Sequence, residues 1–126
     1  MNTKMEKKTG DNIAERLLDF AVSMIKLVDA LPRTVVGKHI GGQLLRSGTS
    51  PGSNYEEARG AESRADFIHK LGVVLKELKE SRFWMKVIYC AKLVSPEHLN
   101  PLISECEELC AIITKSIITA KEKKQF

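Results

Sequence analysis

The chain has 126 residues, of which 43% are hydrophobic and 29% charged, and its formal net charge is +4. This length is enough for one domain with a hydrophobic core but not for two, so we predict a single domain over residues 1–126. The composition excludes a wholly disordered chain. Because the sequence has neither a long apolar run nor a signal peptide, we expect a cytoplasmic protein with no membrane partner.

The first helical pattern covers residues 11–31. Asp11 is a favourable N-cap residue, and apolar side chains recur at helical spacing from Ile13 until Pro32 ends the pattern. Lysine residues gather at both ends of the chain. We therefore expect residues 1–10 and 122–126 to be frayed, solvated tails.

The second predicted helix follows the potential cap Thr34 and carries Val36, Ile40 and Leu44 on its apolar face. Several glycines and Pro51 weaken it, since each internal glycine costs up to about 1 kcal/mol and a proline about 3 kcal/mol. We expect a kink within residues 47–51. The same glycines allow the helix to press closely against a neighbour.

A strip of polar residues lies on one face of this segment if residues 43–59 are helical. It comprises Gln43, Arg46, Ser50, Asn54 and Glu57. The strip is either an internal hydrogen-bonded network that fixes the register of the helices or a small pocket for an anion or nucleotide. We favour the network, because Glu57 repels phosphate and pairs naturally with Arg46 or with the Asn54 amide.

The third predicted helix opens at Glu62 or Ser63 and continues to about Tyr89. Its apolar stripe is wider than one core seam and includes Phe83, Trp84 and Val87. This width is typical of a central helix in a bundle, and it also fits a helix partly buried by a second subunit. Both interpretations remain open at this point.

The fourth predicted helix begins after Ser95 or Asn100, because each is an N-cap residue followed by proline. Its apolar seam consists of Leu102, Cys106, Leu109, Ile113 and Ile117. The four helices have short connections, and no segment shows the alternation of a strand. The sequence therefore predicts an all-α fold, an antiparallel up-down-up-down four-helix bundle.

The residues give no support for catalysis, a metal or a cofactor. The spacing of Asp66 and His69 is half of the carboxylate-bridged metal motif of bundle proteins, but the second half is missing. No nucleophile elbow or phosphate-binding glycine loop occurs. The cysteines, Cys90, Cys106 and Cys110, fall in apolar patterns and are predicted to be reduced core thiols.

Basic side chains spread along the second and third helices are candidates for contact with nucleic acid, because arginine and lysine bind phosphate. They are Arg33, Lys38, Arg46, Arg59, Arg64, Lys70, Lys76, Lys79, Arg82 and Lys86. Glutamates such as Glu77 and Glu80 are interleaved with them. Part of the pattern is therefore an ordinary mixed helix surface.

The block Gln43-Leu-Leu-Arg-Ser-Gly-Thr-Ser50, with Asn54, Glu57-Ala-Arg59 and the later Leu75-Lys-Glu-Leu-Lys-Glu80, resembles one family of four-helix bundles. This is the 23S rRNA-intervening sequence protein family, which is related to the accessory variability determinant protein of diversity-generating retroelements. The similarity extends from Arg16 to about Lys121. The family often has Ser-Ile-Pro-Ala-Asn where this chain has Ser50-Pro-Gly-Ser-Asn54.

The resemblance implies a bundle that assembles into a ring, typically a homopentamer. It also implies a nucleic-acid partner bound through a basic surface, or a nucleic-acid-processing protein partner such as a reverse transcriptase. Our first hypothesis is a non-enzymatic oligomeric scaffold that binds RNA or DNA electrostatically. The alternative is a protein-interaction module that recruits a polypeptide through Phe83, Trp84 and Val87 without direct nucleic-acid binding.

Overall fold

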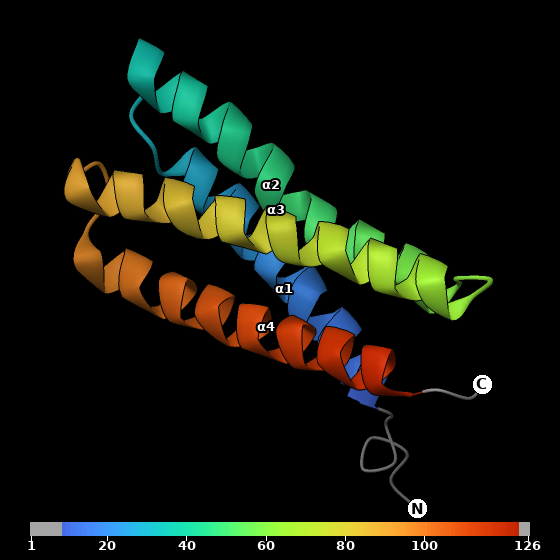
Figure 1. Cartoon of the computed structure of the whole chain (residues 1–126). Helices are drawn as coiled ribbons and strands as arrows, with labels where there is room; N and C mark the ends of the chain where they lie inside the picture. Colours follow the sequence, from blue (N-terminus) through green and yellow to red (C-terminus); the bar gives the residue numbers. More distant parts are fainter. Residues whose placement is uncertain (1–8, 124–126) are drawn as a thin grey trace, which may run out of the picture.

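Four α-helices make up most of residues 9–123, the part of the chain that the computed structural model describes (Figure 1). They are α1 (Thr9–Asp29), α2 (Val35–Arg59), α3 (Arg64–Cys90) and α4 (Pro96–Glu122). Consecutive helices lie side by side and are joined by short loops, and these residues contain no strand. The prediction of an all-α fold of four helices is confirmed. Within residues 9–123, no helix is long and apolar enough to span a bilayer.

Three of the helices begin at side-chain caps that the sequence predicts. The hydroxyls of Thr34, Ser63 and Ser95 each accept a hydrogen bond from the backbone N–H three residues further on, at 3.1, 3.0 and 3.4 Å. Such bonds satisfy amide groups that have no partner inside the helix. Helix α4 therefore starts after Ser95, and Asn100 lies inside it.

The start of α1 differs from the prediction. The helix begins at Thr9, so Asp11 lies in its first turn, where its carboxylate accepts a hydrogen bond of 2.5 Å from Arg59. An aspartate there is also favoured by the helix dipole. Of the predicted tails, residues 1–8 and 124–126 lie outside the described part of the chain, and Thr9, Gly10 and Glu122 are helical.

Glycines bring α1 and α2 into close contact. A Cβ atom added at Gly48 would lie 2.3 Å from Cγ of Met24, and one added at Gly41 would lie 3.2 Å from a methyl group of Val28. The predicted close approach at the glycines is therefore confirmed. The α-helix also continues through residues 47–51, with Pro51 buried inside it.

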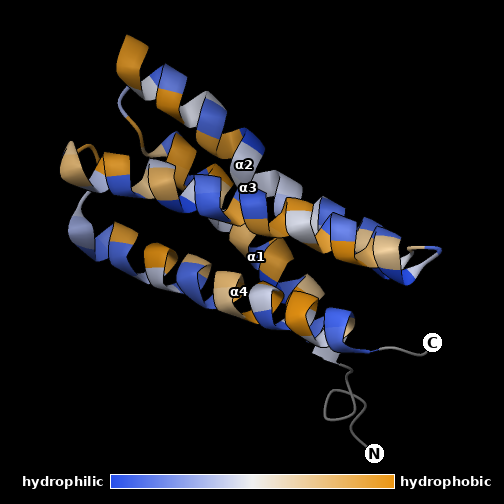
Figure 2. Cartoon of the chain, in the orientation of Figure 1, coloured by the Kyte–Doolittle hydropathy of each residue, from blue (hydrophilic) through white to orange (hydrophobic). Residues whose placement is uncertain are grey.

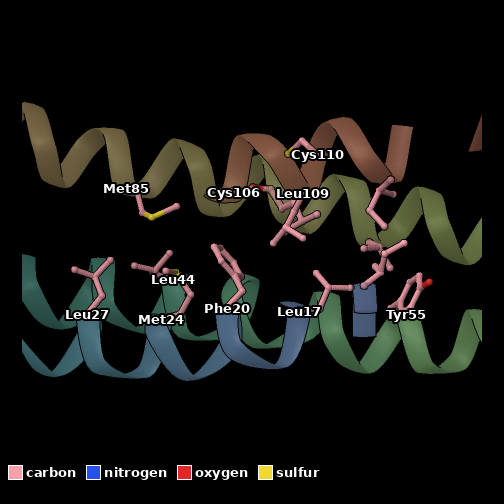
Figure 3. Packing of buried hydrophobic residues seen from close by; sticks show 14 of the residues in the cluster. Leu17, Phe20, Met24, Leu27, Leu44, Tyr55, Met85, Cys106, Leu109 and Cys110 are labelled. Carbon is pink, nitrogen blue, oxygen red and sulfur yellow. Dashed lines mark hydrogen bonds between the residues drawn. The ribbon is translucent and has the colours of Figure 1, made fainter. Parts of the chain in front are cut away.

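The hydrophobic core lies between the pair α1 and α2 and the pair α3 and α4 (Figure 3). Leu17, Phe20 and Met24 follow one another along α1, and they point toward the layer that carries Met85 and Leu109. At most 2% of each of these side chains is exposed. This continuous apolar interior accounts for most of the stability of such a bundle.

Two polar groups are completely buried between α2 and α3. The hydroxyl of Ser81 lies 2.9 Å from that of Ser47 and 3.0 Å from the backbone oxygen of Glu77. The pair satisfies both hydroxyls, so neither carries the cost of an unmade hydrogen bond. Small side chains at these two positions also let α2 and α3 pack closely.

The cysteines do not all behave as predicted. Cys106 and Cys110 are buried free thiols, and Cys106 lies 3.2 Å from the backbone oxygen of Leu78. Cys90, the last residue of α3, is exposed. Its position at the end of the helix removes it from the core, so the prediction of a core thiol is wrong for this residue.

The seam between α1 and α4 is closed by an ionic contact. The Arg16 guanidinium donates to both oxygens of Glu105, at 3.0 and 2.6 Å, and to Glu108 at 3.0 Å. The hydrogen bonds to Glu105 raise the pKa of Arg16, so the side chain stays charged. Direct contacts between these two helices are few compared with the other seams.

Candidate functional site

The polar strip of α2 lies at the surface edge where α2 meets α3. Arg46 and Glu57 are exposed, and Gln43, Ser50 and Asn54 are half-buried. The strip therefore follows the margin of the α2–α3 contact and does not run through the core. The prediction of a buried internal strip is wrong, because the periodicity of one helix does not tell which side its neighbour covers.

The pairing of the strip also differs from the prediction. Arg46 donates to Glu77 and Glu80 on α3, and the Lys70 amine of α3 lies 2.8 Å from the Glu57 carboxylate. The side-chain amide of Asn54 donates to the backbone oxygen of Ser50, within its own helix. Arg46 and Glu57 thus pair across the helices and not with each other. These cross-helix ion pairs align α2 with α3.

Ser50 has a buried hydroxyl oxygen with no hydrogen-bond partner among the described residues. The residue as a whole is half-buried, so the oxygen alone does not define a ligand pocket. The ion pairs around it already occupy the charged groups that an anion would need. The geometry therefore gives no support to the alternative of an anion or nucleotide pocket at the strip.

Four of the predicted nucleic-acid contacts are engaged in ion pairs. Arg46 and Lys70 pair as described above, Arg59 binds Asp11 on α1, and Lys86 lies 3.9 Å from Glu107 on α4. The hydrogen bond to Asp11 raises the pKa of Arg59, and the hydrogen bond to Glu57 raises that of Lys70. These cations are partly neutralised by their own chain, which reduces their attraction for phosphate.

Arg64 has a different role at the end of the bundle. It is the first residue of α3, and its guanidinium lies 3.5 Å from the backbone oxygen of Ala120 on α4. The side chain is half-buried. It therefore joins the start of α3 to the last turns of α4.

The remaining predicted cations form no ion pair within the described residues. Arg33 and Lys38 flank the start of α2 and are exposed, and Lys79 and Arg82 lie on α3 beside α4. The pKa of the Cys110 thiol is lowered to about 7 by its hydrogen bond with Cys106, and Arg82 and Lys79 lower it further. Lys86, which follows Lys79 and Arg82 at helical spacing, pairs with Glu107 on α4, so these cations lie on the α4 side of α3. They are free to meet an anionic partner.

The basic residues do not form one continuous patch. Lys38 and Arg59 lie in the first and last turns of α2, which are about 30 Å apart at 1.5 Å per residue. Lys79 and Arg82 lie on the same side of α3 as Lys86, which pairs with α4, and away from the ion-paired α2–α3 edge. The fold therefore distributes the candidate nucleic-acid contacts over separate surfaces.

Two residues of the wide apolar stripe of α3, Trp84 and Val87, are partly covered by the chain itself. Trp84 packs edge-to-face on His39 of α2, with ring centroids 6.1 Å apart, and its indole N–H donates to Glu80 at 3.1 Å. Val87 packs against the core, whereas Phe83 remains 57% exposed. The wide stripe is thus mainly that of a central helix, and only Phe83 of the three residues offers a large open apolar surface.

A second apolar surface was not recognised in the sequence. Leu18, Val22 and Ile25 lie on one face of α1 and are 62%, 42% and 45% exposed. Leu45 of α2 is 40% exposed and lies level with Ile25, because Gly48 contacts Met24 and Gly41 contacts Val28. We call these four residues the outer apolar face. The sequence did contain an indication of this face, because Leu18, Val22 and Ile25 are spaced four and three residues apart.

Possible metal ligands do not cluster in the described part of the chain. Within residues 9–123, no three His, Cys, Asp or Glu side chains gather closely enough to hold a metal ion. Asp66 and His69 lie near the start of α3, and His69 is exposed. The notable surfaces are therefore the unpaired cations and the outer apolar face.

Comparison with known proteins decides the family. The model of the 23S rRNA-intervening sequence protein family matches residues 11–115. This chain belongs to that family. A crystal structure from the S23 ribosomal protein family of Bacteroides thetaiotaomicron VPI-5482, a protein of unknown function, has the same fold.

The two structures agree over most of their lengths. Their TM-score is 0.79 at 31% sequence identity, with 87% of this chain and 98% of the other chain covered. Comparison with curated proteins gives no match. The match to the 23S rRNA-intervening sequence protein family thus includes parts of all four helices, from the first turn of α1 to the later part of α4. It assigns no reaction to the chain.

Proposed function

We propose that this chain is a cytoplasmic, non-enzymatic scaffold that assembles into a ring of identical subunits and binds RNA or DNA electrostatically. The observation that supports the nucleic-acid part is the set of predicted cations without an ion pair, which are Arg33, Lys38, Lys76, Lys79 and Arg82. The chain neutralises neighbouring cations with its own carboxylates, whereas these have no ion-pair partner among residues 9–123. An oligomer repeats the set, and the net charge of +4, in every subunit.

The outer apolar face supports self-association. Exposed large hydrophobic residues clustered on one face typically mark an interaction site. A ring of five copies is the assembly that the family resemblance implies. A nucleic-acid-processing protein such as a reverse transcriptase is the protein partner that the same resemblance suggests.

The nucleic-acid interface is tested by charge reversal. We expect Lys79→Glu combined with Arg82→Glu to weaken binding of a single-stranded RNA about tenfold. The slope of log affinity against log salt should fall by roughly 1.4, since each phosphate contact contributes about 0.7. Fluorescence anisotropy at about 50 to 200 mM salt measures both quantities.

The matched control combines Lys26→Glu with Lys121→Glu. It changes the net charge by the same amount, but in the last turns of α1 and α4. We expect it to retain most of the affinity. Equal losses in the two double variants would show that overall charge, not the α3 surface, determines binding. A wild-type protein that fails to bind RNA even at low salt would overturn the nucleic-acid proposal.

The assembly is tested at the centre of the outer apolar face. We expect Val22→Glu to convert the oligomer into monomers, because a carboxylate cannot be buried there without a partner. Native mass spectrometry at micromolar concentration gives the stoichiometry, and circular dichroism checks the helices. Val35→Glu is the control, since Val35 is 86% exposed on the first turn of α2. A monomeric wild-type protein at this concentration contradicts the ring.

A further inference from the structure

At one end of the bundle α1 begins, α4 ends and the α2–α3 loop crosses (Figure 1). The residues at this end line an open cavity of about 820 Å³. Residues from all four helices line it, from Ile13 on α1 and Ala58 on α2 to Phe67 on α3 and Ile112 on α4. Its volume lies in the range of pockets that hold small organic ligands. It is separate from the outer apolar face and from Lys79 and Arg82.

The cavity has an apolar lining with cations around it. Ile13, Ala58 and Phe67 belong to the hydrophobic core or pack against it. Lys115 and Lys123 of α4 also line the cavity, are exposed, and form no ion pair within residues 9–123. Arg59 and Arg64 add two further cations, and Glu62 is the single carboxylate among the described residues of the lining. Even with Arg59 paired to Asp11, positive charge predominates.

We propose that this cavity binds a small anionic amphiphile, a molecule with one carboxylate or similar anionic group on an apolar chain. The apolar part would replace water against Phe67 and Ile112, and the anionic group would lie beside Lys115. This arrangement combines the two features of small-molecule sites, apolar burial and a few polar groups that fix orientation. The inference is independent of the proposed binding of nucleic acid.

Two other occupants fit the cavity less well. A nucleotide base requires paired donors and acceptors, and among residues 9–123 no Asn or Gln side chain lines the cavity. Residues 1–8 precede the cavity in the sequence, but they contain Lys4, Lys7 and Lys8 against a single Glu6. Their net positive charge opposes the cations of the lining. An anionic ligand is favoured over both.

The experiment uses dodecanoate as the probe, titrated into the full chain below its micelle-forming concentration and followed by isothermal titration calorimetry. We expect one dodecanoate per subunit. Lys115→Glu should weaken dodecanoate binding about tenfold, equivalent to about 1.4 kcal/mol, while leaving the binding of dodecan-1-ol unchanged. Thr119→Trp should abolish binding of both, because Thr119 is exposed at the cavity and a Trp there fills it.

Leu18→Ala is the control for binding to the outer apolar face and should have no effect. The proposal is overturned if dodecanoate does not bind, if Leu18→Ala removes the binding, or if Lys115→Glu and wild type bind equally. It is also overturned if binding becomes strong only after deletion of residues 1–8, which would make that segment the natural occupant. Circular dichroism of each variant separates loss of the site from loss of the fold.

Discussion

Replacing Phe20 with alanine is expected to destabilise the protein by about 3–5 kcal/mol. Phe20 is the largest completely buried side chain, only 2% exposed, and it lies in the middle of the core beside Leu17 and Met24 (Figure 3). Its removal takes away buried apolar area and leaves a cavity that the surrounding helices can fill only in part. Urea unfolding followed by circular dichroism gives the change in free energy.

The control for this prediction is Leu18→Ala on the same helix. Leu18 is 62% exposed, so the folded monomer should lose no more than about 0.5 kcal/mol. If copies associate through the outer apolar face, a further loss should appear only at high protein concentration, because association stabilises by mass action. An equal loss for Phe20→Ala and Leu18→Ala at every concentration would contradict the packing described here.

Gly48→Ala is expected to cost about 2 kcal/mol, although alanine is the better helix former. The added Cβ would lie 2.3 Å from Cγ and 2.7 Å from Cβ of Met24, a side chain that is fully buried. Either α1 and α2 must separate or Met24 must leave its position in the core. Thermal unfolding and urea unfolding both measure the loss.

Gly42→Ala provides a matched comparison on the same helix. Gly42 is exposed, and nothing lies within 4 Å of a Cβ added there. We therefore expect a gain of about 0.5–1 kcal/mol from the higher helix propensity of alanine. If both glycine variants became more stable, the close contact between α1 and α2 would be refuted.

The helices themselves could be predicted from local signals. Thr34 and Ser63 have the side chains and spacing of N-caps, and apolar periodicity marks the inner face of each helix. These features act within one or two turns, so a single sequence contains them. At the start of α1 the prediction of Asp11 as the N-cap was wrong. Its carboxylate pairs with Arg59, which is distant in the sequence.

The candidate surfaces were harder to predict because they depend on which helices are neighbours. Arg46 and Lys70 read as possible phosphate contacts in the sequence, but in the fold each meets a glutamate that is more than ten residues away. The partly covered Trp84 depends in the same way on His39, which α2 brings against it. Only the packed structure distinguishes the paired cations from Lys79 and Arg82.

The exposed apolar residues also depend on which helices are neighbours. Figure 2 shows hydrophobic and hydrophilic segments along every helix, and the first turn of α2 is hydrophobic although its Val35 is 86% exposed. A helix can carry more apolar residues than its own bundle buries. The sequence reports how many there are, and the packing decides which of them remain for a partner.

The contact between α1 and α4 makes one seam of the bundle unlike the others. The backbones of α1 and α4 approach each other at few points, and the ion pairs of Arg16 with Glu105 and Glu108 bridge the gap at the surface. Because salt weakens such charges, the outermost helices should part first when the protein is stressed. The contact between α2 and α3 would persist, so the bundle would open between α1 and α4.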